Sequence, residues 1–382
     1  MLTVRWQHAM ARRMARQGLI DGADGPSTPL EAVERMVGAQ AQVQNAAELS
    51  VAMRTPTGTV ADVREAIARG ELVRMTGLRG TIHLVAAAEL GTWVAVFGTL
   101  PVGRFPSTQE EQPTPDQIEV LCAAIAATVA EQGPCTLDEL HDGVVDRAGP
   151  WAADPVMPAF QGMWPRWRLV QGVAARRGLW VYGPNRGRAV TFAAPPPFEP
   201  VEQGVAAEEL LLRYLRAYGP STPAAYAKWH AAPPAWAART FTALAEAGRI
   251  TEVDLDGQPA WLAADDLEFP EEPPRGTRLL PYFDALAIAA HPRERFYPGR
   301  AYERALAGGQ AGNYPVLVVD GEVAGVWHQR TSARKARISV EPLAALAPVR
   351  QRELESEVDR IGRLQGLVAE LTIGEVTVGP HA

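Results

Sequence analysis

The amino-acid sequence predicts an α+β protein made of three tandem winged helix-turn-helix modules and a β-rich C-terminal unit. The middle of the chain repeats the order helix, turn, helix, helix and β wing, which is the order of that motif. Both copies carry a Gly-Pro-x-Thr element at the same point, at residues 133–136 and 219–222. From Leu279 onward, strand-like segments replace the alanine-rich helices. A helical bundle with occasional hairpins is the alternative interpretation.

Composition indicates a globular protein and excludes several classes. The chain has 382 residues, 47% hydrophobic and 21% charged, a globular balance and length for roughly two or three domains. Its two cysteines, Cys122 and Cys135, form neither a disulfide framework nor a four-ligand zinc pattern. The N-terminus has no signal-peptide pattern, and a glutamate, two glycines and a proline interrupt the apolar segment 84–103. We therefore expect a cytoplasmic protein that has no metal site and does not enter a membrane.

The first module is expected over residues 1–110. Residues 28–31 (Thr-Pro-Leu-Glu) predict a capping box with proline at the first helical position, and Val33 and Val37 continue the apolar face of that helix. Gly38 is a stop signal. A further helix is expected over residues 61–68, and the strand-like residues 72–84 would form the wing.

Gln40 and Gln42 follow the first helix with a spacing of two. In an extended segment this spacing makes both side chains point the same way, into one cleft. Glutamine pairs in loops usually only contact water or hold the backbone, so a structural role is the alternative. If the pair is catalytic, it places two uncharged amides where hydrolases usually have a carboxylate.

The second and third modules are expected over residues 111–200 and 201–274. Helices in these modules are predicted at 119–131, from 137, ending near 168–170, at 208–217, around Tyr226 and at 235–247. The wings are predicted as a strand at 178–183 and as a hairpin at 250–262 that turns at Asp256-Gly257. Proline-rich residues 195–197 and 271–274 mark the module boundaries.

The C-terminal unit is expected over residues 275–382. Residues 279–284 are strand-like, and a hairpin over 315–327 turns at Asp320-Gly321, a strong hairpin signal. A charged helix is predicted at 350–362, and a last strand at 371–378.

Basic residues are unevenly distributed, although the formal net charge is -7. No acidic residue occurs between Pro155 and Phe198 or between Trp327 and Val340. The basic residues of these stretches that we select as nucleic-acid contacts are Arg166, Arg168, Arg176, Arg177, Arg330, Arg334, Lys335 and Arg337. A mixed, solvated surface is the alternative, because clustering in sequence need not survive folding.

Four segments together resemble the HTH_42 superfamily of winged-helix proteins, in particular the AlkZ-like bacterial DNA glycosylases of the azinomycin-resistance type. They are residues 37–42 with the Gln-x-Gln element, 79–84 (Arg-Gly-Thr-Ile-His-Leu), 280–284 (Leu-Pro-Tyr-Phe-Asp) and 316–327 with Asp320-Gly321. No segment is specific alone, but the combination is in the family's order and the similarity spans nearly the whole chain. The resemblance implies three winged-helix units around a concave basic cleft that accepts double-stranded DNA. It also implies that two glutamines and a β-hairpin in that cleft are needed for activity.

Carried over to this chain, the resemblance makes Gln40 and Gln42 the catalytic candidates of a monofunctional DNA glycosylase that uses no cofactor. Arg79 becomes a candidate for phosphate contact and His83 for orientation, although a histidine in a wing is more often a satisfied structural group. Asp284 ends an apolar strand, which favours a structural hydrogen-bonding role over catalysis.

Two hairpins compete for entry into the DNA. We prefer residues 316–327 with the basic continuation to Arg337, and the wing at 72–84 is the competitor.

Neutral glutamines restrict the substrate, since they offer neither a useful proton nor a base. Alkylation at purine N7 makes the base cationic, so the base leaves as a neutral molecule without being protonated. We therefore expect cationic N7-alkylpurines in double-stranded DNA, including bulky adducts or interstrand crosslinks of a genotoxic natural product. We assign Gln42 to water positioning and Gln40 to support of the developing cation, and the exchanged assignment is the alternative.

Two other function classes compete with an enzyme. A winged-helix regulator or a lesion-sequestering protein would bind DNA without chemistry, and a scaffold would bind another protein. Tandem modules in one chain favour a monomer that wraps one DNA site over a sequence-specific dimer.

Overall fold

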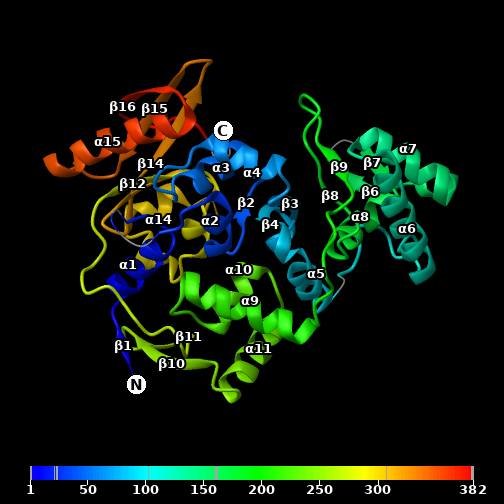
Figure 1. Cartoon of the computed structure of the whole chain (residues 1–382), viewed down its shortest axis with the longest axis horizontal. Helices are drawn as coiled ribbons and strands as arrows, with labels where there is room; N and C mark the ends of the chain where they lie inside the picture. The colour runs from blue at the N-terminus through cyan, green and yellow to red at the C-terminus, as the bar shows by residue number, and fades with distance from the viewer. Residues whose placement is uncertain are drawn as a thin grey trace. The chain divides into compact units, whose positions relative to one another are not determined.

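The computed structural model describes residues 2–20, 22, 25–101, 103–159, 162–306 and 308–379. It has a mixed α+β fold (Figure 1). The chain divides into two compact units: unit 1 comprises Met1–Leu72, Leu84–Ala86 and Glu208–Ala382, and unit 2 comprises Val73–His83 and Ala87–Ala207. Within the described ranges, no helix has both the length and the hydrophobicity of a membrane span.

Threonine caps set two helices near the start of unit 1. Helix α2 (Pro29–Arg35) begins where Oγ1 of Thr28 accepts a hydrogen bond from the N–H of Glu31 at 3.1 Å. The carboxylate of Glu31 accepts from Ser27 and not from the N–H of Thr28, so the predicted capping box is only half formed. Helix α4 (Val60–Ala68) begins at a complete capping box. The other elements here are β1 (Thr3–Val4), α1 (Trp6–Arg16), β2 (Ala39–Gln40) and α3 (Gln44–Ala52). The two predicted helices are confirmed, whereas the sequence analysis missed α1 and α3.

Three helices and a hairpin follow in the middle of the chain, in the predicted order. They are α9 (Gln203–Tyr218), α10 (Pro223–His230), α11 (Pro234–Glu246), β10 (Ile250–Leu255) and β11 (Gln258–Ala263). The hairpin turns at Asp256-Gly257, with φ of 50° and 83°, and β1 pairs with β10 in parallel. The ring of Tyr226 stacks against those of Trp229 and Trp236, with centroids 5.8 and 5.7 Å away, which joins α10 to α11.

A five-stranded sheet forms the C-terminal part of unit 1, in the order β12-β13-β14-β15-β16. Its strands are β12 (Thr277–Leu280), β13 (Val316–Val319), β14 (Glu322–Thr331), β15 (Lys335–Pro342) and β16 (Val368–Ile373). The helices of this part are α12 (Ala285–Ala289), α13 (Arg293–Phe296), α14 (Arg300–Ala305) and α15 (Pro348–Gln365). Figure 1 shows α15 running along this sheet, against which it buries Leu354, Val358 and Ile361. The predicted turn is confirmed at Asp320-Gly321, where both residues have positive φ.

The predicted last strand is shifted. Strand β16 starts at Val368 and ends at Ile373, before the predicted end at Val378, and it pairs with β15 in parallel. Helix α15 supplies the crossover that a parallel pair requires.

The described part of unit 2 packs its helices around buried tryptophans and carries the β3-β8-β9-β5 part of a six-stranded sheet. Its helices are α5 (Leu90–Gly98), α6 (Pro115–Gln132), α7 (Leu137–Ala148) and α8 (Trp167–Arg176). Its strands, two of which continue into unit 1, are β3 (Leu72–Thr76), β4 (Ile82–Ala86), β5 (Cys135–Thr136), β6 (Pro155–Ala159), β7 (Gly162–Pro165), β8 (Val181–Tyr182) and β9 (Thr191–Ala193). Trp167 is fully buried, and its Nε1–H donates to His141 Nδ1 at 3.0 Å.

The third helix of the second module was predicted in the wrong place. It was expected to end near residues 168–170, but α8 begins at Trp167 and continues to Arg176. The antiparallel pair β6–β7 occupies the segment before it. Prolines at 155, 158 and 165 are unfavourable inside a sheet, yet an isolated two-stranded ribbon tolerates them because each strand has a free edge.

Candidate active site

The Gln-x-Gln element follows a strained helix end. After α2, the N–H of Gly38 donates to Val33 O at 3.0 Å, and that of Val37 donates to Glu34 O at 3.0 Å. Val37 has φ of 53° and Gly38 has φ of 88°. Glycine adopts such a φ freely, but a β-branched valine there is an outlier that costs free energy. The helix end therefore fixes the direction in which β2 leaves α2.

The two glutamines occupy different environments. Gln40 belongs to β2 and is 7% exposed, whereas Gln42 lies in the short connection to α3 and is exposed. The sequence analysis expected both side chains to point into one cleft. In the structure one residue is buried and the other is exposed, so solvent reaches them unequally. Gln42 has the accessible amide of the pair.

The wall of a pocket of about 130 Å³ includes Val43, the residue after Gln42. Segments far apart in the sequence form its wall: Val43, Asn45, Ala46, Leu49, Pro281, Tyr282, Pro315, Trp327, Gln329, Thr331 and Gln365. The side chains of Gln329 and Gln365 exchange two amide hydrogen bonds, at 2.7 and 3.2 Å. Two of the motif segments, 280–284 and 316–327, thus meet beside the Gln-x-Gln element. Sequence reasoning missed Gln365, because nothing near it matched a motif.

The wall of this pocket contains no acidic residue, and the nearby carboxylates are engaged elsewhere. Asp284 is fully buried and accepts from both terminal nitrogens of Arg54 at 2.9 Å, with Ser50 Oγ at 2.7 Å from the same carboxylate. Its Oδ1 also accepts from the N–H of Leu286, which caps α12. The structural role predicted for Asp284 is confirmed, because this network uses both carboxylate oxygens.

Glu48, on α3, is the second buried carboxylate of this region. It is 1% exposed, and its two oxygens accept from the amide of Gln44 at 2.8 Å and from the guanidinium of Arg64 at 2.8 Å. A carboxylate held by a cation and an amide is poorly suited to act as a base, since both partners stabilise its charged form and occupy its lone pairs.

Three of the four motif segments contain a non-glycine residue with positive φ outside a hairpin turn. They are Val37 beside the glutamines, Arg79 at φ 57° and Phe283 at φ 55°, directly before Asp284. Strained backbone of this kind persists only where surrounding contacts enforce it, and it concentrates at functional sites. Propensity alone could not have located these residues, since none of them favours that conformation.

Arg79 and His83 belong to unit 2. His83 is 2% exposed, its Nδ1 lies 3.1 Å from Thr81 O, and its ring packs so closely on Gly77 that a Cβ there would lie 2.9 Å from it. Arg79 is half-buried, and its Nη2 lies 3.4 Å from Nε2 of His83. This burial supports a packing role for His83 and leaves its predicted part in DNA contact as a prediction.

Two of the four arginines predicted in unit 2 pair with carboxylates from outside their own stretch. Arg177 makes a bidentate pair with Glu119 at 2.8 and 2.9 Å, and Arg166 pairs with Asp154 at 3.3 Å. Arg168 stacks on Trp164 with its Cζ 3.8 Å from the ring centroid, and burial lowers the pKa of its guanidinium. Arg176 is half-buried on α8. Residues 155–198 contain no acid, but in the folded protein acidic residues from outside this stretch lie next to its arginines.

The basic residues of unit 1 gather at one turn of the C-terminal sheet. Arg330 and Arg334 are exposed and have no ion-pair partner in the described part of the chain. Lys335 pairs with Glu370 at 2.5 Å, and Arg337 lies 3.7 Å from the same carboxylate. In Figure 1 the turn between β14 and β15 projects from the rest of the sheet.

The other turn of β14 is held against the protein. Asp320 pairs with Arg350 at 2.7 Å, and a Cβ at Gly321 would lie 2.5 Å from Pro274. Of the segment preferred for DNA entry, only the basic continuation after Trp327 is free to reach a partner, and the Asp-Gly turn is not.

Comparisons with known proteins identify the family of the chain. A family model described as AlkZ-like, DNA glycosylase AlkZ-like, matches residues 33–364. An interstrand DNA cross-link repair glycosylase of Streptomyces sahachiroi is 27% identical over 372 residues, which cover 95% of this chain and 97% of that protein. The solved structure of Streptomyces sahachiroi DNA glycosylase AlkZ matches with a TM-score of 0.77 and 25% identity, covering 98% of this chain and 100% of that chain. The chain therefore belongs to the AlkZ-like family of DNA glycosylases, enzymes that hydrolyse N-glycosyl bonds.

Proposed function

We propose that this glycosylase removes cationic N7-alkylpurines from double-stranded DNA and that Gln40 and Gln42 provide the catalytic groups. The observation that carries the proposal is the absence of acidic residues from the wall of the pocket that includes Val43, the residue after Gln42. The adjacent pocket has no acidic wall residue, and the buried carboxylates of Asp284 and Glu48 are already bound by arginines. A site of this kind has no group to protonate a departing base.

The chemistry of an alkylated base removes the need for that group. A purine alkylated at N7 carries a positive charge, so breaking its glycosidic bond releases a neutral base and leaves a sugar with oxocarbenium character. Amide oxygens stabilise such a charge by their dipoles and hold a water molecule by hydrogen bonds. The substrate therefore supplies the activation that a general acid would otherwise provide.

The difference in burial favours one division of roles. Gln42 is exposed and can meet both the sugar and a water molecule, so we assign it to water positioning. Gln40 is buried, where the lower dielectric strengthens its dipole, so we assign it to support of the developing cation.

For DNA binding we propose three winged-helix modules around a concave cleft, with the β14–β15 turn entering the duplex. The unpaired Arg330 and Arg334 support this choice of hairpin over the turn at Asp320-Gly321. Such arginines bind phosphates, and phosphate contacts suit an enzyme that reads damage rather than sequence. We expect the protein to act as a monomer in the cytoplasm.

We also propose that bulky N7 adducts and interstrand crosslinks are substrates. The relative from Streptomyces sahachiroi is named for cross-link repair. A pocket of about 130 Å³ is too small for two crosslinked bases, so a crosslink would have to be attacked without being enclosed there. Release of a cationic base is compatible with such an attack, because no general acid has to surround the departing base and protonate it.

A release assay tests the proposal. Duplex DNA containing a single N7-methylguanine is incubated with the wild type, with Gln42→Ala and with Gln44→Ala, and free base and abasic sites are measured. We expect release by the wild type and Gln44→Ala and about 100-fold slower release by Gln42→Ala, the loss typical of removing one stabilising donor or dipole. Unchanged release by Gln42→Ala would refute the mechanism, and tight binding without release would indicate a lesion-sequestering protein.

A further inference from the structure

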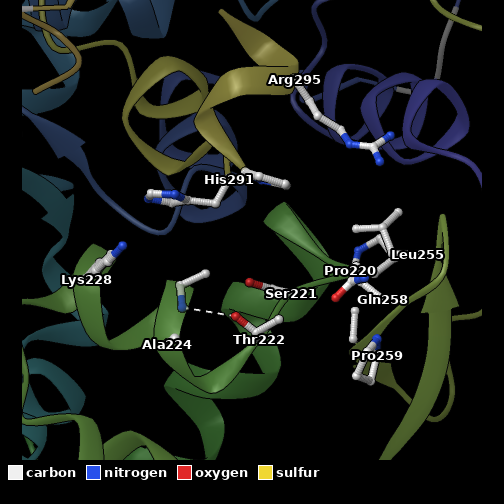
Figure 2. Close-up of a pocket in the computed structure, with 13 residues that line it drawn as sticks. Pro220, Ser221, Thr222, Ala224, Lys228, Leu255, Gln258, Pro259, His291 and Arg295 are labelled. Atoms are coloured by element: carbon white, nitrogen blue, oxygen red, sulfur yellow. Dashed lines mark hydrogen bonds between the residues drawn. The ribbon is translucent and has the colours of Figure 1, made fainter. Parts of the chain in front are cut away.

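A second pocket in unit 1, far larger than the first, has no part in the chemistry described above. It has a volume of about 520 Å³, within the usual range for small-molecule sites. Its wall is formed by Pro220, Ser221, Thr222, Ala224, Ala225, Lys228, Leu255, Gln258, Pro259, Ala260, His291, Pro292 and Arg295. These residues come from α10 and the three residues before it, from the β10–β11 hairpin and from the segment around α13 (Figure 2).

Prolines, alanines and a leucine make up most of the wall, which therefore suits an apolar ligand body. The polar groups lie on separate sides. Figure 2 shows the side chains of Lys228 and His291 at one side and Arg295 at the other, with the hydroxyl groups of Ser221 and Thr222 between them.

The charge of the wall is positive. It includes Lys228 and Arg295 and no acidic residue. Arg295 is already paired with Asp256, but Lys228 is exposed and has no ion-pair partner in the described ranges. Lys228 is one of only two lysines in the sequence, so its ammonium group is a rare feature of this chain.

A buried arginine behind the wall adds to this positive charge. Arg13 is 2% exposed, and its guanidinium donates to the backbone oxygens of Pro220 at 2.8 Å and His291 at 3.4 Å, two residues of the wall. No carboxylate pairs with it within the described part of the chain; its other close contact is the ring of Trp6, 4.9 Å from its Cζ to the centroid. Burial lowers the pKa of Arg13 to about 10, which still leaves it charged at neutral pH.

His291 does not compete for a cation or add a charge. Burial, together with the charges of Arg293, Lys228 and Arg13, lowers its pKa to about 3, so the imidazole is neutral at neutral pH. A neutral imidazole beside an ammonium group offers a hydrogen bond to a ligand without opposing an anion.

We infer that this pocket binds a small amphipathic anion, an apolar ring or chain that carries one carboxylate, sulfonate or phosphate group held by Lys228. The apolar walls exclude a strongly hydrated ion alone, and the uncompensated charges of Lys228 and Arg13 select against a cation. The inference is independent of the reaction proposed at Gln42, because no residue of this wall belongs to that site.

A pair of fluorescent probes tests the inference on the full chain. 8-Anilinonaphthalene-1-sulfonate has the ring system and one negative charge, and N-phenyl-1-naphthylamine has the same rings without the charge. We expect the wild type to bind the sulfonate about tenfold more tightly, the effect of one hydrogen bond to a charged group. Lys228→Met should lose this preference while it still binds the neutral probe.

The chain supplies its own matched control, since Lys335→Met removes the only other lysine and lies on β15, outside this pocket. Lys335→Met should keep the wild-type affinity for both probes. Ala224→Trp, a substitution at an exposed wall residue, should block both probes by filling the space. If Lys228→Met binds the sulfonate as tightly as Lys335→Met, or if Ala224→Trp leaves both affinities unchanged, the inference is overturned.

Discussion

Asp284 and Gln42 show two opposite uses of a polar side chain in the same unit. The carboxylate of Asp284 is fully buried and held by Arg54, Ser50 and a backbone N–H, so it contributes to the fold. Gln42 is exposed, and the residue that follows it, Val43, lies in the wall of a pocket without acidic residues. The comparison shows that the buried charged group contributes to stability, whereas the exposed amide of Gln42, the catalytic group that we propose, is not tied into the fold by burial.

The largest effect is expected from breaking the buried pair. Asp284→Ala leaves the guanidinium of Arg54 buried without its anion, which should lower the free energy of unfolding by about 3–5 kcal/mol. Denaturant unfolding followed by circular dichroism measures this loss. The double variant Asp284→Ala with Arg54→Met should recover part of the lost unfolding free energy. If Asp284→Ala alone is as stable as the wild type, the ion pair does not stabilise this region.

Gln42→Ala should reduce activity and leave stability nearly unchanged, the opposite of what we expect for Asp284→Ala. Its turnover rate on N7-methylguanine DNA should fall about 100-fold, whereas its unfolding free energy should change by less than about 0.5 kcal/mol, because the amide is exposed. Turnover kinetics and thermal unfolding on one preparation check both parts. A fall in stability that matched the fall in rate would make Gln42 a structural residue like Asp284.

The two turns of β14 extend the comparison to DNA binding. Arg334→Ala removes an unpaired charge and should lower the slope of log Kd against log salt concentration by about 1, as expected for one lost phosphate contact. Arg350→Ala removes the partner of Asp320 at the other turn and should leave that slope unchanged. Equal slopes for Arg334→Ala and the wild type would remove the β14–β15 turn from the proposed interface.

The smallest effect is expected at Arg177. Its guanidinium is already paired with Glu119 through two hydrogen bonds on an exposed surface, so Arg177→Ala should change DNA affinity and stability only slightly. Fluorescence anisotropy with a labelled duplex measures the affinity. A loss as large as that of Arg334→Ala would show that Arg177 leaves Glu119 to bind phosphate.

Local signals in the sequence located much of the fold. The threonines identified in the sequence at 28, 136 and 222 cap helices, and both Asp-Gly turns are hairpins, because these features depend on neighbouring residues. The ribbon β6–β7 was missed, because the sequence analysis assigned the segment before residues 168–170 to a helix. The ion pair of Arg177 with Glu119 spans 58 residues, so no local pattern could show that this arginine is engaged.

The candidate site was predicted only in part. The motifs identified Gln40, Gln42 and Asp284, and the structural role of Asp284 followed from its apolar setting. The unequal burial of the two glutamines depends on long-range packing, as does the meeting of Val43, Tyr282 and Gln365 in one wall. The positive φ of Val37 and Phe283 opposes their intrinsic preferences, so propensity pointed away from it.

The most direct test of the central claim compares two lesions in the same duplex, cationic N7-methylguanine and uncharged hypoxanthine, under single-turnover conditions with excess enzyme. If neutral glutamines act only on a base that is already charged, N7-methylguanine is released at a rate that depends on Gln42, and hypoxanthine is not released above the rate without enzyme. Release of hypoxanthine at a comparable rate would contradict the account, because it would require a proton donor that the neutral wall beside Gln42 does not contain.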